Sequence, residues 1–255
     1  MPSSITTDVA IIGAGTAGLT AFSELRRLGL SAVLIDHGPL GTTCARVGCM
    51  PSKAALHAGH QWANLRALLK EAAAPAGSAT PDDLWSHARR TRDLLAGNTA
   101  KRTREVAGDR LLTGTARFTG PNTVDVNGQP IHARAFIVAT GSRPEVPQAL
   151  AALGDRLLTT DSLFDLDTLP RSVGMLGLGA IGLEMGLALS RLGVRLVAGD
   201  MKALPAGITD PKIGARAIEH FSGEITMWLG RPVEATARQQ SIELRSGDAV
   251  EQVDV

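Results

Sequence analysis

Apolar runs that alternate with amphipathic stretches organise most of this 255-residue chain. The apolar run at residues 9–12 leads into a glycine loop, an amphipathic stretch and a second apolar run that ends at Asp36. This succession predicts a strand, a helix and a second, parallel strand. The unit recurs at an offset of 164 residues, where it begins at residues 173–176 and ends at Asp200. We therefore expect an α/β protein with two Rossmann-like, three-layer domains.

Two helices and a small β-meander are predicted between the two copies. Helical periodicity covers residues 53–70 and 81–106, and proline and glycine interrupt it at residues 75–78. Asn127–Gly128 is typical of a hairpin turn. Short alternating runs predict the strands of the meander, at residues 111–118, 123–126 and 131–139. The second Rossmann-like domain is thus expected to follow a meander.

The C-terminal part of the chain predicts less regular structure. Residues 211–221 look helical and residues 224–229 extended. Ser246–Gly247–Asp248 predicts a hairpin between two further short strands. Because a hairpin is a poor closing element for a parallel sheet, we expect the second fold to be unfinished.

Composition and charge narrow the class of protein. The hydrophobic content is 44% and the formal net charge is +1, so no nucleic-acid partner is implied. No apolar run reaches the roughly 20 residues that a membrane span requires, and residues 1–4 lack a basic signal region. We predict a cytoplasmic protein. Its two cysteines are too few for a disulfide scaffold and suggest redox or metal chemistry.

Each glycine loop has the spacing of a dinucleotide-binding loop, with an acid 18 positions after its last glycine. The first glycine allows a tight turn, the second lets a pyrophosphate approach the backbone, and the third lets helix and strand pack closely. The helix N-terminus stabilises the phosphate charge. The alternative is two ordinary surface turns. The glycines are Gly13, Gly15 and Gly18 in the first loop, and Gly177, Gly179 and Gly182 in the second.

The two acids bear on the choice of nucleotide. Carboxylates at Asp36 and Asp200 would accept hydrogen bonds from ribose hydroxyls and repel a 2′-phosphate, so NAD is expected over NADP. Alternatively, Asp200 is a solvated loop acid, and the nearby Lys202 keeps NADP open.

The most specific segment contains both cysteines, Cys44 and Cys49. A regular helix separates the Cα atoms of residues five apart by about 8–9 Å, whereas a disulfide needs less than about 7 Å. The pair can therefore close only in a distorted segment, for which Gly48 provides freedom. Two alternatives remain open. One is a zinc site with His57 and His60 as further ligands, and the other is two inert buried thiols.

Four motifs together resemble the class I pyridine nucleotide–disulfide oxidoreductases, a family that includes dihydrolipoyl dehydrogenase, mercuric reductase and glutathione reductase. The motifs are the two glycine loops, Ala139–Thr140–Gly141–Ser142 and the Cys-x4-Cys-x-Pro-Ser-Lys run that ends at Lys53. The resemblance spans the whole chain and is nearest to dihydrolipoyl dehydrogenase. Thr42, Arg46 and Ala180 depart from the usual family pattern.

The resemblance implies a role for each site residue. Cys44 would attack the substrate and Cys49 would be the charge-transfer thiol beside the flavin, so the catalytic set is Cys44, Cys49, Lys53 and Glu184, with Lys53 and Glu184 paired near the flavin. FAD would be bound by Gly13, Gly15, Gly18, Asp36, Thr43, Lys53, Thr140 and Gly141. NAD would be bound by Gly177, Gly179, Gly182 and Asp200. No metal is expected.

The resemblance also implies domains and partners. We predict the first segment of an FAD-binding domain at residues 1–150, an incomplete NAD-binding domain at 151–255 and no dimerisation domain. The expected substrate is a small-molecule or lipoyl-domain disulfide, and the full-length form would be a homodimer. Alternatives are a mercuric reductase-like or other disulfide reductase, or a non-catalytic, truncated nucleotide-binding fragment. The family takes its catalytic base from a later domain, so we expect the chain as given to be inactive alone.

Overall fold

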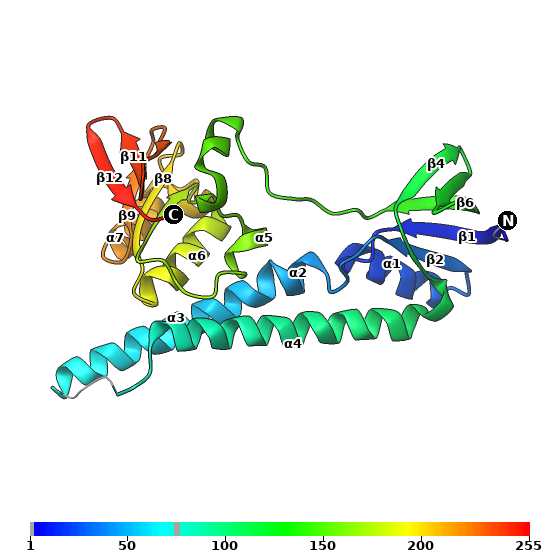
Figure 1. Cartoon of the computed structure of the whole chain (residues 1–255), viewed down its shortest axis with the longest axis horizontal. Coiled ribbons are helices and arrows are strands. Elements are labelled where there is room, and N and C mark those ends of the chain that lie inside the picture. The colour runs from blue at the N-terminus through cyan, green and yellow to red at the C-terminus, as the bar shows by residue number, and fades with distance from the viewer. Residues whose placement is uncertain (1–2, 74–76) are drawn as a thin grey trace. The chain divides into compact units, whose positions relative to one another are not determined.

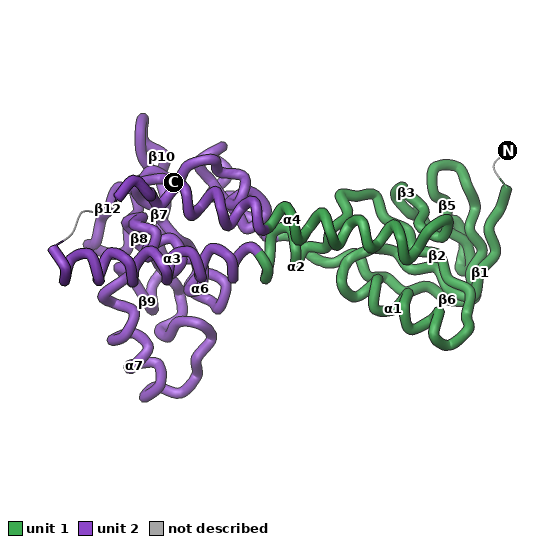
Figure 2. The backbone as a smooth tube through the Cα atoms, turned by 90° about the horizontal axis from the view of Figure 1, so that it is seen from below, with its two compact units in different colours: residues 1–50, 92–143 green, residues 51–91, 144–255 purple. Residues whose placement is uncertain are grey.

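The computed structural model describes residues 3–73 and 77–255, which form two compact units (Figures 1 and 2). Residues 1–50 and 92–143 make up unit 1, and residues 51–91 and 144–255 make up unit 2. The long helices α3 (Cys49–Glu71) and α4 (Pro81–Ala107) contribute to both units. Of the predicted interruption at residues 75–78, Pro75 and Ala76 lie outside the described residues.

Unit 1 is built on a six-stranded sheet in the order β3-β2-β1-β6-β5-β4. The strands β3, β2, β1 and residues 131–138 of β6 pair in parallel, whereas β4, β5 and residues 129–132 of β6 form an antiparallel meander. The bounds are β1 (Ile5–Ile12), α1 (Thr16–Arg27), β2 (Ala32–Asp36), α2 (Thr43–Arg46), the 3₁₀ turn Gly108–Arg110, β3 (Leu111–Thr113), β4 (Ala116–Gly120), β5 (Thr123–Val126) and β6 (Gln129–Val138).

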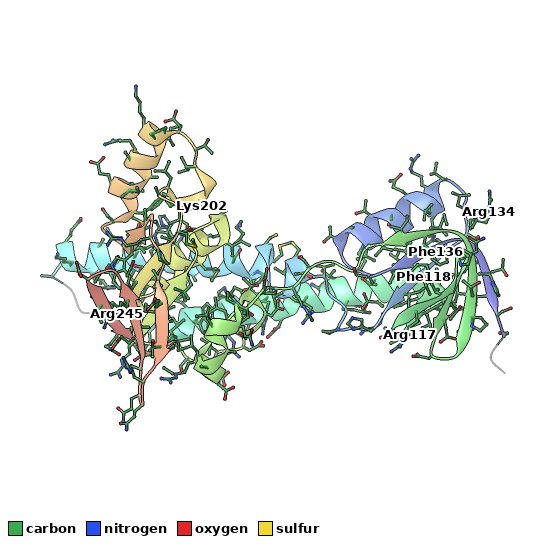
Figure 3. The ribbon with its side chains drawn as sticks, turned by 90° about the horizontal axis from the view of Figure 1, so that it is seen from above. Arg117, Phe118, Arg134, Phe136, Lys202 and Arg245 are labelled. Carbon is green, nitrogen blue, oxygen red and sulfur yellow. The ribbon has the colours of Figure 1, made fainter. Side chains whose placement is uncertain are left out.

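The sheet of unit 1 packs on both faces, because successive side chains of a strand point to opposite faces of a sheet. Val9 and Ile11 pack with Phe22 of α1 on one face, where each fully buried side chain contributes about 1.5–3 kcal/mol. Ala10 packs with residues of the meander on the other face. At the rim, Phe118 and Phe136 meet edge to face with ring centroids 4.9 Å apart (Figure 3).

Unit 2 repeats this layer order. A parallel sheet in the order β7-β8-β9 carries α6 on one face, and an antiparallel sheet, β10-β11-β12, packs through a separate apolar cluster that includes Val197 of β8. The bounds are the 3₁₀ segment Gln148–Arg156, α5 (Thr160–Leu163), β7 (Ser172–Leu176), α6 (Ala180–Arg191), β8 (Arg195–Asp200), the 3₁₀ turn Pro205–Gly207, α7 (Pro211–Phe221), β9 (Thr226–Leu229), β10 (Glu234–Ala237), β11 (Ile242–Ser246) and β12 (Ala249–Val253).

The prediction for residues 111–118 was wrong in detail, one strand was missed, and the C-terminal hairpin lies outside the parallel sheet, as expected. The predicted strand 111–118 is two strands, because Gly114 has a φ of +155° and separates β3, which pairs with β2, from β4, which pairs with β5. The strand β10 was not predicted. The C-terminal hairpin does not close the parallel sheet, because it belongs to the β10-β11-β12 meander, and beyond it the Gly174 amide of β7 donates to the Val255 carbonyl oxygen.

The predicted fold class is confirmed, and the described residues include no helix long and apolar enough to cross a membrane. The repeat also preserves the orientation of side chains. Val33 and its counterpart Val197 both face a meander, whereas Leu34 and its counterpart Ala198 both face a helix. The offset of 164 residues therefore relates two copies of one layered structure.

Candidate nucleotide-binding and dithiol site

The first glycine loop turns sharply between β1 and α1 and touches the end of β6. Gly13 has a φ of +109°, and a Cβ atom there would lie 2.2 Å from the Ala139 carbonyl oxygen. A Cβ on Gly18 would lie 1.8 Å from the Gly13 carbonyl oxygen. Real Cβ atoms do not approach oxygen so closely, so these two positions require glycine on packing grounds.

The middle glycine of the loop faces open space. A Cβ on Gly15 would meet no heavy atom within 4 Å. Gly15 is also the N-cap of α1, where no side chain accepts a hydrogen bond from the first turn and no acid is present. By contrast, the Asp210 carboxylate caps α7. The α1 N-terminus thus offers amide donors, positive dipole and room, which is what a pyrophosphate group requires.

Asp36, at the end of β2, is hydrogen-bonded to the first glycine loop. Its carboxylate accepts hydrogen bonds from the backbone amides of Ala14 and Gly38, each at 2.6 Å. The acid is therefore tied to the glycine loop, while its role toward a ribose stays a prediction. Neither Ala14 nor Gly38 was predicted as a site residue.

The second glycine loop has the same geometry. A Cβ on Gly182 would lie 2.0 Å from the Gly177 carbonyl oxygen, whereas Gly179 has open space around it. The Asp200 carboxylate accepts from the amides of Leu178 at 2.7 Å and Lys202 at 2.8 Å. These donors are the counterparts of Ala14 and Gly38, so the 164-residue offset was a signal that could have identified them.

Thr140 and Gly141 follow β6 beside the first loop. A Cβ on Gly13 would lie 3.2 Å from the Thr140 amide nitrogen, so this segment contacts the glycine turn. Gly141 has a φ of +73°, a conformation that favours glycine. The structure therefore brings Thr140 together with Gly13 and Asp36, although their assignment to FAD stays a prediction.

The two cysteines lie on either side of a break between helices. Cys44 is in the single turn α2, the backbone leaves helical geometry at Val47, and α3 begins at Cys49. The predicted distortion is present, but Gly48 does not use a positive φ. Glycine suits this position because it has no side chain: a Cβ atom on Gly48 would lie 3.2 Å from the Cys44 Cα atom. The glycine lets the two cysteine-bearing segments approach each other.

The thiols affect each other's chemistry. A hydrogen bond with Cys49 raises the pKa of the Cys44 thiol above its ordinary value, and partial burial adds to the shift. Cys44 is half-buried and Cys49 is exposed, and both are thiols in this structure. Cys44 therefore holds its proton more firmly than an ordinary thiol and needs a base before it can act as a nucleophile.

Thr42, which departs from the usual family pattern, combines an unusual backbone conformation with a helix cap. Its φ is +59°, a region that a β-branched residue rarely adopts and that glycine adopts freely. The Thr42 hydroxyl accepts a hydrogen bond from the Ala45 amide at 3.1 Å and so caps α2. The cap offsets part of the backbone strain next to the dithiol. Thr43, the first residue of α2, is exposed.

Lys53 and Glu184 form an ion pair within unit 2. The Lys53 ammonium lies 2.6 Å from the Glu184 carboxylate, which joins α3 to α6. Lys53 is one helical turn after Cys49, so the pair anchors the helix that begins with that cysteine. The predicted pairing is present, while its role toward the flavin stays a prediction.

No cluster of three or more histidine, cysteine, aspartate or glutamate side chains within residues 3–73 and 77–255 has the geometry to hold a metal ion. The zinc alternative, with Cys44, Cys49, His57 and His60, would require such a cluster. The dithiol reading does not depend on one.

Comparison with known proteins supports the family resemblance. A family described as "Pyridine nucleotide-disulphide oxidoreductase" matches residues 7–255. The chain is 28% identical to a mercuric reductase of Lysinibacillus sphaericus over 97% of its own length and 42% of that protein. It is 35% identical to a dihydrolipoyl dehydrogenase of Thermus scotoductus, over 79% of its length and 44% of that protein.

A solved structure extends the likeness to the whole fold. The HOCl-induced flavoprotein disulfide reductase RclA from Escherichia coli superimposes with a TM-score of 0.80 at 21% identity, and the match covers 97% of this chain and 55% of that one. The chain spans about half the length of the curated relatives that it matches.

Proposed function

Since the chain belongs to the pyridine nucleotide–disulfide oxidoreductase family, we propose that it is the part of an FAD-dependent disulfide oxidoreductase that carries the redox dithiol and both nucleotide loops. The observation that supports this proposal best is the cysteine pair at the break between α2 and α3. The same unit contains the first glycine loop, whose helix α1 has no side-chain cap. A dihydrolipoyl dehydrogenase-like activity is the finer proposal, supported by 35% identity to one such enzyme. A mercuric reductase-like activity is the second candidate.

The first loop fits FAD on the geometry of its residues. Gly15 leaves room for a pyrophosphate and the α1 N-terminus has no side-chain cap, which supports this assignment, and we assign the ribose hydroxyls to Asp36. When bound, FAD supplies two-electron transfer between a nicotinamide nucleotide and the thiol pair. We assign Gly13, Gly18, Thr43, Lys53, Thr140 and Gly141 to this site together with these residues.

The thiol chemistry balances with the two cysteines alone. The Cys44 thiolate attacks one sulfur of a substrate disulfide, and the other substrate sulfur leaves as a thiolate that takes up a proton. Cys49 then attacks the Cys44 sulfur, which releases the second substrate thiol and forms the Cys44–Cys49 disulfide. The substrate is reduced by two electrons and the cysteine pair is oxidised by two. Oxidation of a dithiol substrate follows the reverse path.

We assign the second loop to NAD. Gly177, Gly179 and Gly182 provide the loop, and the Asp200 carboxylate would repel a 2′-phosphate. Initial rates of the full-length enzyme with NADH and NADPH test this assignment. Equal rates would contradict the role given to Asp200.

Residues 1–255 alone are proposed to lack turnover. Thiol–disulfide exchange at Cys44 needs a proton acceptor within hydrogen-bond reach, which the family takes from a later domain. In the full-length enzyme we propose a homodimer. Purified residues 1–255 with excess FAD should not oxidise NADH with lipoamide, and turnover near that of an intact relative would contradict this.

A free-thiol count tests the redox assignment of the cysteines. After mild oxidation the unfolded chain should show no free thiols, and after mild reduction it should show both again. Cys44→Ser should retain one thiol under the same oxidant, which serves as the control for intermolecular bonds. Two thiols that persist in the wild type under oxidant would refute the proposed function.

A further inference from the structure

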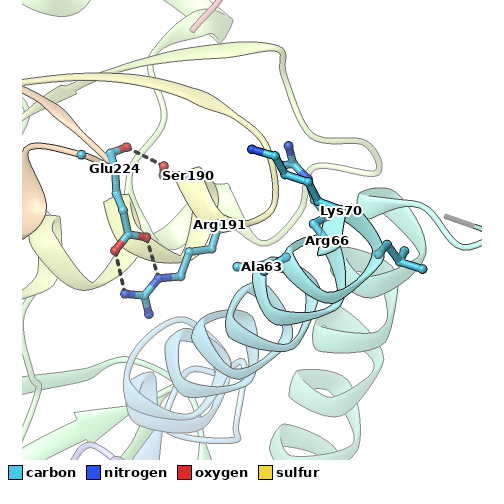
Figure 4. A pocket seen from close by; sticks show the side chains of 9 residues that line it. Ala63, Arg66, Lys70, Ser190, Arg191 and Glu224 are labelled. Carbon is cyan, nitrogen blue, oxygen red and sulfur yellow. Dashed lines mark hydrogen bonds and ion pairs between the residues drawn. The ribbon is translucent and has the colours of Figure 1, made fainter. Parts of the chain in front are cut away.

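A groove of about 550 Å³ lies in unit 2 where the last turns of α3 and α6 run past the segment before β9 (Figure 4). Arg66 and Lys70 of α3 line one side, and Ser190 and Arg191 of α6 line the other together with Glu224. A second hollow of about 310 Å³ shares Arg66, Ser190 and Glu224 with the first. The two hollows share lining residues and together form one groove in unit 2, and neither is lined by residues of the second glycine loop.

The carboxylate of Glu224, which is the one acid among the residues that line the first hollow, is fully engaged. Its two oxygens accept from Nε and Nη2 of Arg191 at 2.7 and 2.9 Å, so the pair is bidentate. This fork lowers the pKa of Glu224, and His220 and His60 add smaller effects. Because Arg191 neutralises it, Glu224 leaves the other cations of the groove uncompensated.

Arg66 and Lys70 provide the free charge. They lie one helical turn apart, both are exposed, and neither has an ion-pair partner in the part of the chain that the structure describes. Figure 4 shows both side chains extending from the same helix, α3. The first hollow thus carries a net charge of about +2, from Arg66, Lys70, Arg191 and Glu224, beside an apolar wall that includes Ala63 and Leu69.

We propose that this groove binds an acidic peptide segment of a protein partner, with carboxylates on Arg66 and Lys70 and an apolar side chain against Leu69. Compact phosphates favour the backbone amides of helix N-termini, whereas the anion-binding groups of this groove are the side chains Arg66 and Lys70 near the end of α3. Carboxylates spaced along a peptide can each pair with one of the two cations, Arg66 and Lys70, which lie one helical turn apart on α3. The apolar wall beside these cations also suits a peptide, which carries apolar side chains, better than a small inorganic anion.

Fluorescence anisotropy with the whole chain tests the proposal. A labelled, glutamate-rich peptide with a central leucine should bind at low salt, and its Kd should rise with salt. The double variant Arg66→Glu, Lys70→Glu should weaken binding at least tenfold. The matched control Arg102→Glu, Arg104→Glu makes the same charge change at two exposed positions of α4 and should bind as the wild type does.

Three results would overturn the proposal: no binding by the wild type, equal weakening in the control variant, or equal binding of a peptide with glutamine for glutamate. Displacement of the peptide by inorganic phosphate at equal concentration would instead indicate a phosphate site. A photoreactive version of the peptide adds a test that needs no variant. It should label the wild-type chain near residues 63–70 or 190–224, and labelling confined to other regions would contradict the assignment. None of these results depends on the redox proposal.

Discussion

At the scale of single residues, the glycines of one loop serve two different physical needs. Gly18 is required because a side chain would collide with the Gly13 carbonyl group, whereas Gly15 keeps a space open outside the chain. The first need concerns folding and the second concerns the ligand. Alanine substitutions at Gly18 and at Gly15, made one at a time, distinguish the folding need from the ligand need.

Gly18→Ala should destabilise unit 1 by about 1–3 kcal/mol or prevent its folding, because its Cβ would lie 1.8 Å from a carbonyl oxygen. Gly15→Ala should change the free energy of unfolding by less than about 0.5 kcal/mol, because its Cβ meets nothing and the φ of Gly15 is −76°. It should nevertheless weaken FAD binding about tenfold or more. Urea unfolding and FAD fluorescence titration measure the two effects. Unchanged FAD affinity in Gly15→Ala would argue against the site.

The Arg191–Glu224 pair predicts a dependence of stability on pH. The pair lowers the pKa of Glu224 in the folded state, so its contribution is present above the unfolded-state pKa of about 4.3 and is lost as the pH falls through the lowered value. Glu224→Gln should reduce stability by about 1–2 kcal/mol at pH 7. The difference from the wild type should shrink as the pH falls below about 4.3 and through the lowered pKa of Glu224. A difference that is constant across this range in urea unfolding would contradict the assignment.

At the scale of elements, the helix that begins with Cys49 is held against the second fold by a close crossing. A Cβ on Gly59 of α3 would lie 2.7 Å from the Ala188 carbonyl oxygen of α6. Together with the Lys53–Glu184 ion pair, this crossing fixes the position of α3 on α6. The glycine is therefore needed at the contact although it lowers intrinsic helix propensity.

Two glycine-to-alanine substitutions test this view of α3. Gly59→Ala should destabilise unit 2 by about 1–3 kcal/mol because the helices must move apart. Gly97→Ala in α4 is the matched control: it also lies within a helix, a Cβ there meets nothing, and it should stabilise the chain by about 0.5–1 kcal/mol. Thermal unfolding compares them. Stabilisation by both substitutions would show that the crossing is looser than described.

Sequence periodicity predicted the long elements well and the short ones less well. The helix 81–106 corresponds to α4, Pro81–Ala107, because a long periodic run leaves little ambiguity. The strand 111–118 was divided by Gly114, whose positive φ cannot be read from the pattern. β10 has only four residues, and its partner β11 decides its conformation. Tertiary pairing overrides local propensity in such segments.

At the scale of the whole molecule, the internal repeat carried the most information. It predicted two nucleotide-binding folds, and the structure and the family match confirm that architecture. The contacts of Asp36 and Asp200 with their own loops were not predicted, because they depend on the path of the backbone. The groove beside Arg66 was also beyond prediction, since its walls come from segments more than 100 residues apart.

The proposed function requires the Cys44–Cys49 pair to exchange electrons with a flavin bound in unit 1. Replacing one cysteine at a time tests it most directly, because a thiolate next to oxidised flavin produces a long-wavelength charge-transfer band. At saturating FAD, Cys44→Ser should show this band from Cys49, and Cys49→Ser should not. The visible spectrum recorded as the pH is raised measures it. A band in neither variant would show that the cysteines do not adjoin the flavin, and a band only in Cys49→Ser would reverse the roles of the two thiols.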